Sequence, residues 1–194
     1  MIARSKYPNH YKNITFIFND VDTMPAENIF FDYTTTTGII KHFYGYNFAL
    51  GGIVSITGED FENVNGFPCY WAWGFEDNRL NRRVLDAGMK IDRSHFYPIY
   101  DKENIIQLKH GMERTVNRGE FDRYVLNVEE GISTLTNIGF QIEPTGFIHI
   151  QSFHTVHKEN KQLEKSYDIR STQKPFIPRP STLRQRNIRM KLVL

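Results

Sequence analysis

Apolar and polar positions along the chain predict an alternation of strands and helices. Residues 13–19, NITFIFN, form an apolar run rich in strand-forming residues, and it ends in the acidic turn DVD at 20–22. This pattern is typical of a buried strand that delivers polar groups at its carboxyl end. Further strands are predicted at 28–33, 38–43, 50–56 and 103–108, and a hairpin joins 137–143 to 147–153 across PTG.

Signals for helix starts and stops complete this pattern. Thr57, with Asp60 three residues later, is typical of a helix N-terminus and predicts a helix over 58–64. A second helix is predicted for 76–87, closed by Gly88, and a third for about 120–129, capped by Gly131. Strands that alternate with helices favour an α/β fold in which helices sandwich a largely parallel sheet.

Length and composition limit the class of protein. The 194 residues suffice for one domain with a tail. The single cysteine, Cys69, excludes an internal disulfide framework and gives no sign of an oxidising compartment. No apolar run approaches the roughly 18 residues of a membrane span, and the N-terminus lacks the apolar centre of a signal peptide. We therefore expect a soluble protein, of unknown localisation.

Charge divides the chain into a body and a tail. Residues 158–194 hold ten Lys/Arg and three Asp/Glu, whereas residues 1–157 hold 14 and 19. A basic, polar segment that contains prolines is usually solvated, so we expect a domain over 1–157 and a flexible tail over 158–194. The tail has no interleaved aromatic and basic residues, so no nucleic-acid partner is expected.

The acidic turn is a candidate metal site. Asp20 and Asp22 lie one residue apart after a predicted strand, at the edge where α/β folds bind ligands. Carboxylate oxygens suit Mg²⁺ or Mn²⁺, and such an ion would neutralise a diphosphate. A capped turn without a metal explains the same residues equally well, and both interpretations stay open.

An aromatic loop supplies a second candidate site. Tyr70, Trp71 and Trp73 come directly before Glu76 and Asp77. Aromatic rings pack on the apolar faces of sugars, and carboxylates accept hydrogen bonds from hydroxyl groups or remove their protons. The alternative is a small aromatic core followed by acids that favour the start of a helix.

The order of these motifs closely resembles the catalytic half of the β-1,4-galactosyltransferase family. The series runs FIFNDVDTMP, LGGIVSITGEDFENVNGFP, YWAWGFEDNRLNRRVLDAGM, then His110 and EFDRY, and covers about residues 13 to 155. The resemblance implies a glycosyltransferase-A-like α/β fold, with a mixed sheet flanked by helices. It also implies a metal-dependent, inverting transfer of galactose or N-acetylgalactosamine from a UDP-sugar to a sugar acceptor.

The resemblance assigns a metal site. Asp22 and His110 match the family's metal ligands, and Asp20 lies beside the nucleotide. Gln107 stands where the family carries a methionine, and an amide oxygen is a harder ligand than a thioether. This exchange would shift the preference from Mn²⁺ toward Mg²⁺. A hydrogen-bonded surface histidine remains the alternative for His110.

The resemblance also assigns substrate-binding residues. Asp77 matches the catalytic base, and Asn78 replaces a family aspartate beside it. Ala49 stands where galactose-selective members carry a tyrosine, which predicts that an N-acetyl group is accepted at least as well as a hydroxyl. The matched donor-binding residues are Gly52, Trp73 and Glu76, and the matched acceptor-binding residues are Tyr46, Asn78 and Phe121.

Three departures from the family motifs carry their own expectations. Ala72 and Phe75 replace family glycines, so the aromatic loop should be stiffer. Only nineteen residues precede Asp20, fewer than the family places there, so we expect the nucleotide-binding strands to be absent from this chain. We therefore expect an unprotected sheet edge, weak binding of UDP-sugar, and an oligomer or a partner chain that supplies this half.

Two other functions fit parts of the sequence. A catalytically weak remnant would serve as a carbohydrate-binding or partner-binding module, and the short N-terminal part favours it. A metal-dependent phosphohydrolase would explain the DVD turn but leaves the tryptophan loop and Phe121 without a role. The intact Glu76–Asp77 pair favours an enzyme over the remnant.

Overall fold

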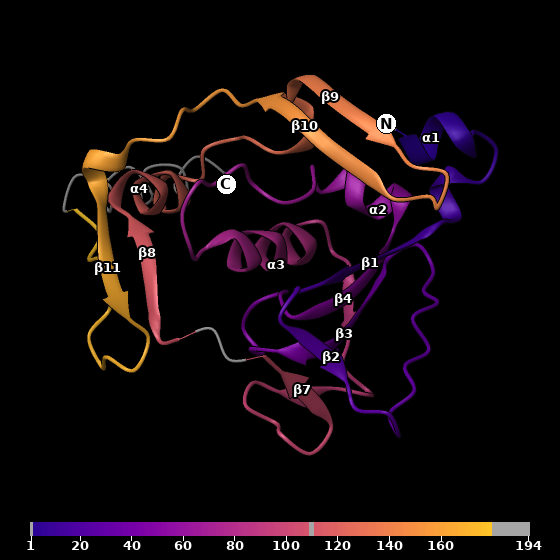
Figure 1. Cartoon of the computed structure of the whole chain (residues 1–194), viewed down its shortest axis with the longest axis horizontal. Coiled ribbons are helices and arrows are strands. Elements are labelled where there is room, and N and C mark those ends of the chain that lie inside the picture. The colour runs from indigo at the N-terminus through magenta and orange to yellow at the C-terminus, as the bar shows by residue number, and fades with distance from the viewer. Residues whose placement is uncertain (1, 109–110, 180–194) are drawn as a thin grey trace, which may run out of the picture. The chain divides into compact units, whose positions relative to one another are not determined.

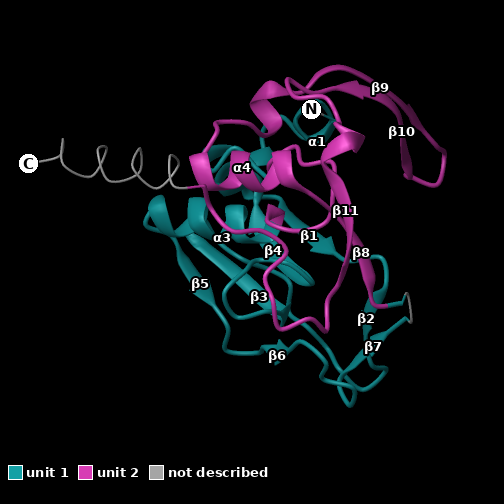
Figure 2. Ribbon diagram, turned by 90° about the vertical axis from the view of Figure 1, so that its left-hand side faces the viewer, with its two compact units in different colours: residues 1–67, 77–111 teal, residues 68–76, 112–194 magenta. Residues whose placement is uncertain are grey.

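The computed structural model describes residues 2–108 and 111–179, and these form two compact units (Figures 1 and 2). The first unit contains residues 1–67 and 77–111, and the second contains 68–76 and 112–194. These units follow a different division from the predicted boundary at 157/158, which stays a prediction. Across the described residues, no helix has the length and apolar character needed to cross a membrane.

A mixed sheet forms the centre of the first unit. Its strands lie in the order β1–β4–β3–β5, and β6 also pairs with β3. The pairs β1/β4 and β3/β4 are antiparallel, whereas β3 pairs with β5 and β6 in parallel. A short connection returns the chain from β3 to β4, so these strands run in opposite directions. The elements are α1 (Ile2–Lys6), η1 (Tyr11–Asn13), β1 (Thr15–Asn19), β2 (Thr23–Pro25), β3 (Ile39–Gly45), β4 (Ile53–Thr57), α2 (Gly58–Asn63), α3 (Glu76–Asp86), β5 (Lys90–Asp92), β6 (Tyr97–Pro98) and β7 (Ile105–Gln107).

Apolar clusters form the core of this sheet. Every residue of β4 is buried, as expected for its central strand. Leu80 and Val84, one turn apart on α3, pack with Ile40, Val54 and Ile56 of the sheet. A second cluster contains Phe31, Phe43, Tyr44, Ile53 and Ile105. The mixed sheet flanked by helices is therefore confirmed, and the largely parallel arrangement is wrong.

Individual elements correct the sequence analysis further. The strand predicted to be buried is β1, which pairs only with β4 within the described residues and leaves Ile17 49% exposed. Residues 28–33 form no strand; they contribute Phe31 to the core without ladder hydrogen bonds. The helix starts at 58 and 76 are confirmed, and the Thr57 hydroxyl accepts the expected bond from the Asp60 N–H.

Two strand pairs and a helix make up the second unit. The predicted hairpin is confirmed: β9 pairs antiparallel with β10. The helix predicted for 120–129 ends earlier, because Asn127 takes the left-handed conformation that closes it. β11 lies within the segment predicted as a tail and pairs antiparallel with β8. The elements are β8 (Glu113–Asn117), α4 (Arg118–Leu126), η2 (Ile132–Thr134), β9 (Thr136–Ile142), β10 (Ile148–His154), η3 (Lys161–Leu163) and β11 (Glu164–Asp168).

Candidate functional site

The acidic turn follows β1 and is closed by backbone hydrogen bonds. The Asn19 side-chain amide donates to the carbonyl oxygens of Asp20 and Thr23, at 2.7 and 2.8 Å. The Thr23 N–H and hydroxyl also donate to the Asp20 carbonyl, at 3.0 and 3.1 Å. The turn is therefore capped, as the simpler interpretation predicts, but these bonds use main-chain carbonyls. They hold the two aspartates in place without consuming their carboxylates.

The strand pair β2/β7 brings Gln107 beside this turn. Thr23 lies opposite Gln107 in the ladder, and the Leu108 N–H donates to the Asp22 carbonyl at 2.7 Å. The Gln107 side chain is exposed, and its Oε1 accepts a 3.3 Å bond from the Tyr44 hydroxyl. The Gln107 backbone therefore lies beside the acidic turn, and its side chain bonds the hydroxyl of Tyr44.

The negative charges of the acidic turn affect the pKa values of the groups around it. Burial raises the pKa of the Tyr44 hydroxyl, and the carboxylates of Asp22 and Asp20 raise it further. Although Asp20 as a whole residue is exposed, partial burial of its carboxyl group raises its pKa. The charge of Asp22 adds to this rise, and the Gly52 N–H opposes it by donating to the carboxylate. A cation beside the two aspartates would relieve this repulsion.

The oxygen atoms at this turn fit a hard divalent cation. Two carboxylates and the amide oxygen of Gln107 are the donor types that Mg²⁺ and Mn²⁺ prefer. Within residues 2–108 and 111–179, no three side chains of His, Cys, Asp or Glu converge on a metal position. His110, the remaining predicted ligand, lies outside the described residues.

Gly51 and Gly52 join this turn to the start of α3. Gly52 has φ 72°, and a Cβ there would collide with the Tyr44 carbonyl. The Asp20 N–H donates to the Gly52 carbonyl at 2.9 Å. A Cβ on Gly51 would overlap the Asp77 carboxylate, and the Leu50 N–H donates to the Asp77 carbonyl at 3.1 Å. Adjacent glycines therefore contact the predicted base and the predicted nucleotide-side acid.

The glycine pair thus lets the backbone approach its neighbours closely. The Gly52 N–H already donates to the Asp20 carboxylate, so any phosphate at this amide would share it. Gly51 is a position that the sequence analysis missed. The repeated glycine was the available signal, but the sequence does not show which partner requires the second glycine.

The connection from β3 to β4 presents aromatic rings. Tyr46 stacks on Phe48, with ring centres 5.1 Å apart, and both side chains are exposed. Ala49 is only 4% exposed, and its N–H donates to the Tyr46 carbonyl at 3.2 Å. Asn78 is half-buried on α3. The predicted acceptor residue Tyr46 is therefore accessible, whereas the predicted selectivity residue Ala49 is enclosed by protein.

In the second unit, the two tryptophans rest on different strand pairs. The Trp73 N–H donates to the Thr115 carbonyl of β8 at 2.9 Å, and the indole stacks with Tyr167 of β11 at 6.5 Å. The indole N–H of Trp71 donates to the His157 carbonyl at 2.9 Å, and its ring stacks with Phe153 of β10 at 5.9 Å. Both indoles remain about 40% exposed, so they are packed and still accessible.

Phe75, which replaces a family glycine, is fixed by aromatic contacts. Its φ of 76° lies in the left-handed region, which is strained for phenylalanine. The ring stacks on Tyr124 and contacts Phe121, with ring centres 5.1 and 5.2 Å away. Phe121 also contacts Phe176 and is only 7% exposed. Phe121 therefore packs among aromatic rings, and its role in an acceptor pocket stays a prediction.

A buried ion network supports the start of the aromatic loop. Arg123 of α4 pairs with Glu120 and with Glu130, the latter at 3.1 Å. Its guanidinium group also lies 5.6 Å from the ring centre of Tyr70. Burial raises the pKa of the Glu120 carboxyl group, whereas the charge of Arg123 and the N–H of Trp71 oppose the rise. The EFDRY motif thus holds residues 70–71 against α4.

The predicted site residues divide between the units. The first unit brings Asp20, Asp22, Gly52 and Gln107 together at one turn, and Gly51 links this turn to Asp77. The second unit contains Trp73, Glu76 and Phe121. Tyr167 was missed, and its position beyond the family motifs gave no signal.

Comparison with known proteins gives the same relatives from sequence and from structure. A family model described as the N-terminal domain of galactosyltransferase matches residues 38–111. The xylosylprotein 4-beta-galactosyltransferase of Caenorhabditis elegans is 30% identical over 108 residues, which are 50% of this chain and 37% of the relative. Bovine beta-1,4-galactosyltransferase 1 is 26% identical over 141 residues, 66% of this chain and 35% of that protein. The matched stretch thus spans about a third of the length of these relatives.

Solved structures share the fold. The catalytic domain of Drosophila beta-1,4-galactosyltransferase 7 in complex with xylobiose superposes with a TM-score of 0.51 at 16% identity. The match covers 74% of this chain and 68% of that one. A mutant of the same enzyme, in complex with manganese, UDP-Gal and xylobiose, gives a TM-score of 0.50. The glycosyltransferase-A-like fold and the family resemblance are both confirmed.

Proposed function

We propose that this chain, a member of the β-1,4-galactosyltransferase family, carries out a metal-dependent, inverting transfer of a hexose from a UDP-sugar to a hydroxyl group of a sugar acceptor. The observation that carries the proposal is the turn at Gly51 and Gly52. It places the carboxylate of Asp77 against one glycine and the backbone of Asp20 against the next, within one compact unit.

Asp77 is proposed as the general base. As the acceptor oxygen attacks the anomeric carbon, its proton passes to the Asp77 carboxylate. The new carbon–oxygen bond forms on the face opposite the phosphate, the old bond to the phosphate oxygen breaks, and UDP leaves with the electron pair. This order of bonds inverts the anomeric centre. The contact with Gly51 restricts the position of the carboxylate, and restricted position is what makes a base effective.

Asp22, Gln107 and His110 would hold the divalent cation, with Asp20 beside the nucleotide. When bound, Mn²⁺ or Mg²⁺ neutralises charge on the leaving diphosphate. The donor set of Asp22 and Gln107 supports either ion, and the manganese complex of the Drosophila relative supports Mn²⁺ as the first ion to test.

The donor contacts are proposed from the hydrogen-bonding groups of the matched residues. The Trp73 indole N–H and the Gly52 amide are natural donors to phosphate oxygens, and Glu76 would accept bonds from galactose hydroxyls. Ala49 is proposed to leave room for an N-acetyl group, so that both donor sugars are used. Because Ala49 is enclosed, this effect would act through the packing of the 46–50 connection, and the preference should be tens-fold at most.

The acceptor contacts are proposed at Tyr46, Asn78 and Phe121. The exposed Tyr46–Phe48 stack offers an apolar ring face to a sugar, and the Asn78 amide can bond its hydroxyl groups. The C. elegans relative is named as a xylosylprotein transferase, and the Drosophila structures contain xylobiose. A terminal β-xyloside is therefore the acceptor to test first.

A radiolabelled transfer assay tests the proposal. The chain is incubated with UDP-galactose or UDP-N-acetylgalactosamine, a β-xyloside acceptor, and Mn²⁺, Mg²⁺ or a chelator. We expect transfer that the chelator abolishes and that Asp22→Ala greatly reduces, whereas Asp101→Ala, at an acidic loop of the same unit, leaves it intact. Transfer that persists in the chelator, or equally in Asp22→Ala, would contradict the metal assignment.

A binding module is the alternative, and one observation favours it. Phe75 fixes the aromatic loop through Tyr124 and Phe121, where the family carries a glycine. A loop held in this way would bind sugar without completing a catalytic cycle. Binding of the acceptor or of UDP-sugar without any turnover, under every metal condition, would favour the module over the enzyme.

A further inference from the structure

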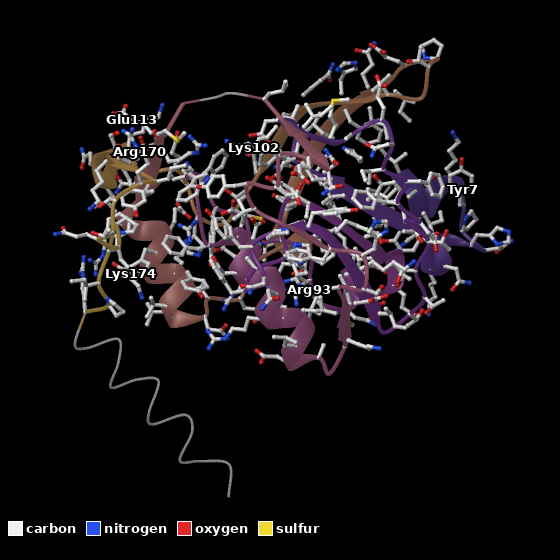
Figure 3. The ribbon with its side chains drawn as sticks, turned by 90° about the horizontal axis from the view of Figure 1, so that it is seen from below. Tyr7, Arg93, Lys102, Glu113, Arg170 and Lys174 are labelled. Atoms are coloured by element: carbon white, nitrogen blue, oxygen red, sulfur yellow. The ribbon has the colours of Figure 1, made fainter. Side chains whose placement is uncertain are left out.

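His42 is a fully buried histidine whose two ring nitrogens are both occupied. It lies on β3 and is only 1% exposed. Its Nε2 is 2.9 Å from the Tyr44 carbonyl oxygen and 3.1 Å from the Gly51 carbonyl oxygen. Its Nδ1 accepts a 3.0 Å bond from Nε of Arg93, which follows β5 and is marked in Figure 3. Two carbonyl partners require a hydrogen on Nε2, and an arginine donor requires a lone pair on Nδ1.

This pattern defines one neutral tautomer. A protonated ring would present a second N–H to the Arg93 guanidinium, so geometry alone disfavours the imidazolium. Burial and the Arg93 charge act in the same direction and lower the pKa of His42 to about 4. Phe96 encloses the pair, with its ring centre 4.8 Å from that of His42 and 5.8 Å from the guanidinium.

The His42 N–H supplies a hydrogen-bond donor where the β3/β4 ladder is irregular. The β3/β4 ladder pairs His42 with Val54 and Tyr44 with Ile53, so the register shifts at Phe43. Such a bulge interrupts the regular ladder and leaves carbonyls without strand donors. The His42 N–H supplies one hydrogen bond donor to both strands, at the end of β3 and at the glycine that precedes β4.

Gly45 shows how closely this arrangement is packed. A Cβ on Gly45 would lie 2.8 Å from the Gly51 carbonyl oxygen and 3.0 Å from His42 Nε2. The Gly51 carbonyl is therefore held between the imidazole and the turn at Gly45. On the other side, Gly51 contacts the Asp77 carboxylate, and Gly52 accepts a bond from the Asp20 N–H and donates one to the Asp20 carboxylate.

We propose that His42, locked by Arg93, is a positioning residue that fixes the Gly51–Gly52 turn and thereby the placement of Asp77 relative to Asp20. It touches neither substrate nor metal. It acts through one peptide, the Gly51 carbonyl, and through the end of β3. The inference rests on the proposed function for its catalytic consequence, but not for the structural role of the imidazole.

Two substitutions separate this role from general stability. His42→Phe keeps the ring volume and removes the N–H and the Nδ1 acceptor, whereas His42→Gln keeps an N–H donor and an acceptor. Ile40→Val, a fully buried change two residues away on β3, is the matched control for loss of packing. Global stability is measured for all four proteins, so that local effects are distinguished from unfolding.

The first measurement is NMR spectroscopy of the chain without ligands. We expect His42 to be the Nε2–H tautomer at pH 7, with Nδ1 unprotonated. Loss of the two hydrogen bonds from Nε2–H to the carbonyls of Tyr44 and Gly51 should speed amide exchange at Gly52 by about 10- to 100-fold in His42→Phe. The slow exchange of the parent at Gly52 should be largely restored in His42→Gln and unchanged in Ile40→Val. An Nδ1–H tautomer, or equal exchange in His42→Phe and Ile40→Val, would overturn the proposal.

The second measurement is the kinetics of transfer. Displacement of a base by about 1 Å can cost about 100-fold in rate, so His42→Phe should lower kcat with little change in KM for UDP-sugar. His42→Gln should recover much of the loss. An equal loss in His42→Gln and His42→Phe would remove His42 from the placement of the base. If the parent chain transfers no sugar, the proposed function fails, and the NMR result still decides the role of His42.

Discussion

The glycine turn in the first unit and the tryptophan loop in the second hold candidate site residues by different means. At the turn, a Cβ on Gly51 would overlap the Asp77 carboxylate and a Cβ on Gly52 would collide with the Tyr44 carbonyl, while the buried His42 imidazole bonds the Gly51 carbonyl. In the loop, side chains provide the support, because Trp71, Trp73 and Phe75 each rest on an aromatic ring. The turn fixes carboxylates closely, whereas the loop fixes aromatic surfaces that tolerate small shifts.

The difference predicts how each region responds to substitution. A single atom added at the glycine turn must displace a carboxylate or a carbonyl, so its effect should appear in catalysis. Removal of a ring from the loop leaves the neighbouring side chains in place. Its effect should therefore appear in binding affinity or in local stability. The ion network is the exception in the second unit, because Glu120 and Glu130 are buried and depend on Arg123 for their counter-charge.

Replacement of the proposed base should have the largest effect. Asp77→Asn keeps the shape of the side chain but cannot accept a proton, so turnover should fall by about 10²- to 10⁴-fold. Binding of UDP-sugar, measured by calorimetry, should hardly change. Asp86→Asn, at the other end of α3 and exposed, serves as the control. Equal turnover in Asp77→Asn and the parent would remove Asp77 from the mechanism.

Breaking the ion network should be the next largest effect. Arg123→Met leaves Glu120 and Glu130 buried without their cation, which should cost about 3–5 kcal/mol of unfolding free energy. The exposed Arg170–Asp168 pair is the comparison, and Arg170→Met should lose far less. Urea unfolding measures both. Similar losses of unfolding free energy in the two variants would show that the Arg123 network stabilises the fold no more than an exposed ion pair does.

Acid should weaken the glycine turn through His42. Burial and the charge of Arg93 lower the pKa of His42 from 6.5 in the unfolded chain to about 4 in the folded protein, so the unfolded state binds more protons between these values. The stabilisation that the neutral His42 ring contributes to the folded state is fully present above pH 6.5 and is lost as pH falls toward 4. A difference of two to three units corresponds to about 3 kcal/mol. The stability of His42→Gln should therefore depend less on pH than that of the parent, and parallel curves would contradict the buried neutral state.

Loss of the ring beneath Trp73 should have the smallest effect. Tyr167→Leu removes an aromatic stack worth about 0.5–1.5 kcal/mol, so affinity for UDP-sugar should fall by about 2- to 10-fold with kcat retained. Tyr7→Leu, at an exposed position of the first unit, controls for loss of a tyrosine. A change in kcat alone would indicate that Tyr167 acts in the chemical step and does not merely pack against the Trp73 indole.

Local signals predicted the elements better than their arrangement. Thr57 and Gly88 mark helix ends through their own backbone preferences, so both were readable. The order of strands depends on contacts between distant residues, and the short connection from β3 to β4 made the sheet mixed. Residues 28–33 have strand-like composition, but they pack as rings without a ladder.

The same distinction applies to the candidate site. The acids and the glycine pair were visible as motifs, whereas their partners were not. His42 and Arg93 lie 51 positions apart, and no local pattern links an imidazole on one strand to a guanidinium after another. Tyr167 lies beyond the family motifs, and only the pairing of β11 with β8 brings it to Trp73.

Transfer of galactose by the parent chain and by Gly51→Ala tests the central claim most directly. The backbone at Gly51 tolerates alanine, so the added methyl group acts only through the Asp77 carboxylate that it would overlap. With UDP-galactose, Mn²⁺ and a β-xyloside, we predict transfer by the parent and about 100-fold slower transfer by Gly51→Ala, at unchanged affinity for UDP-galactose. Equal rates in the two proteins, or no transfer by the parent, would contradict the account.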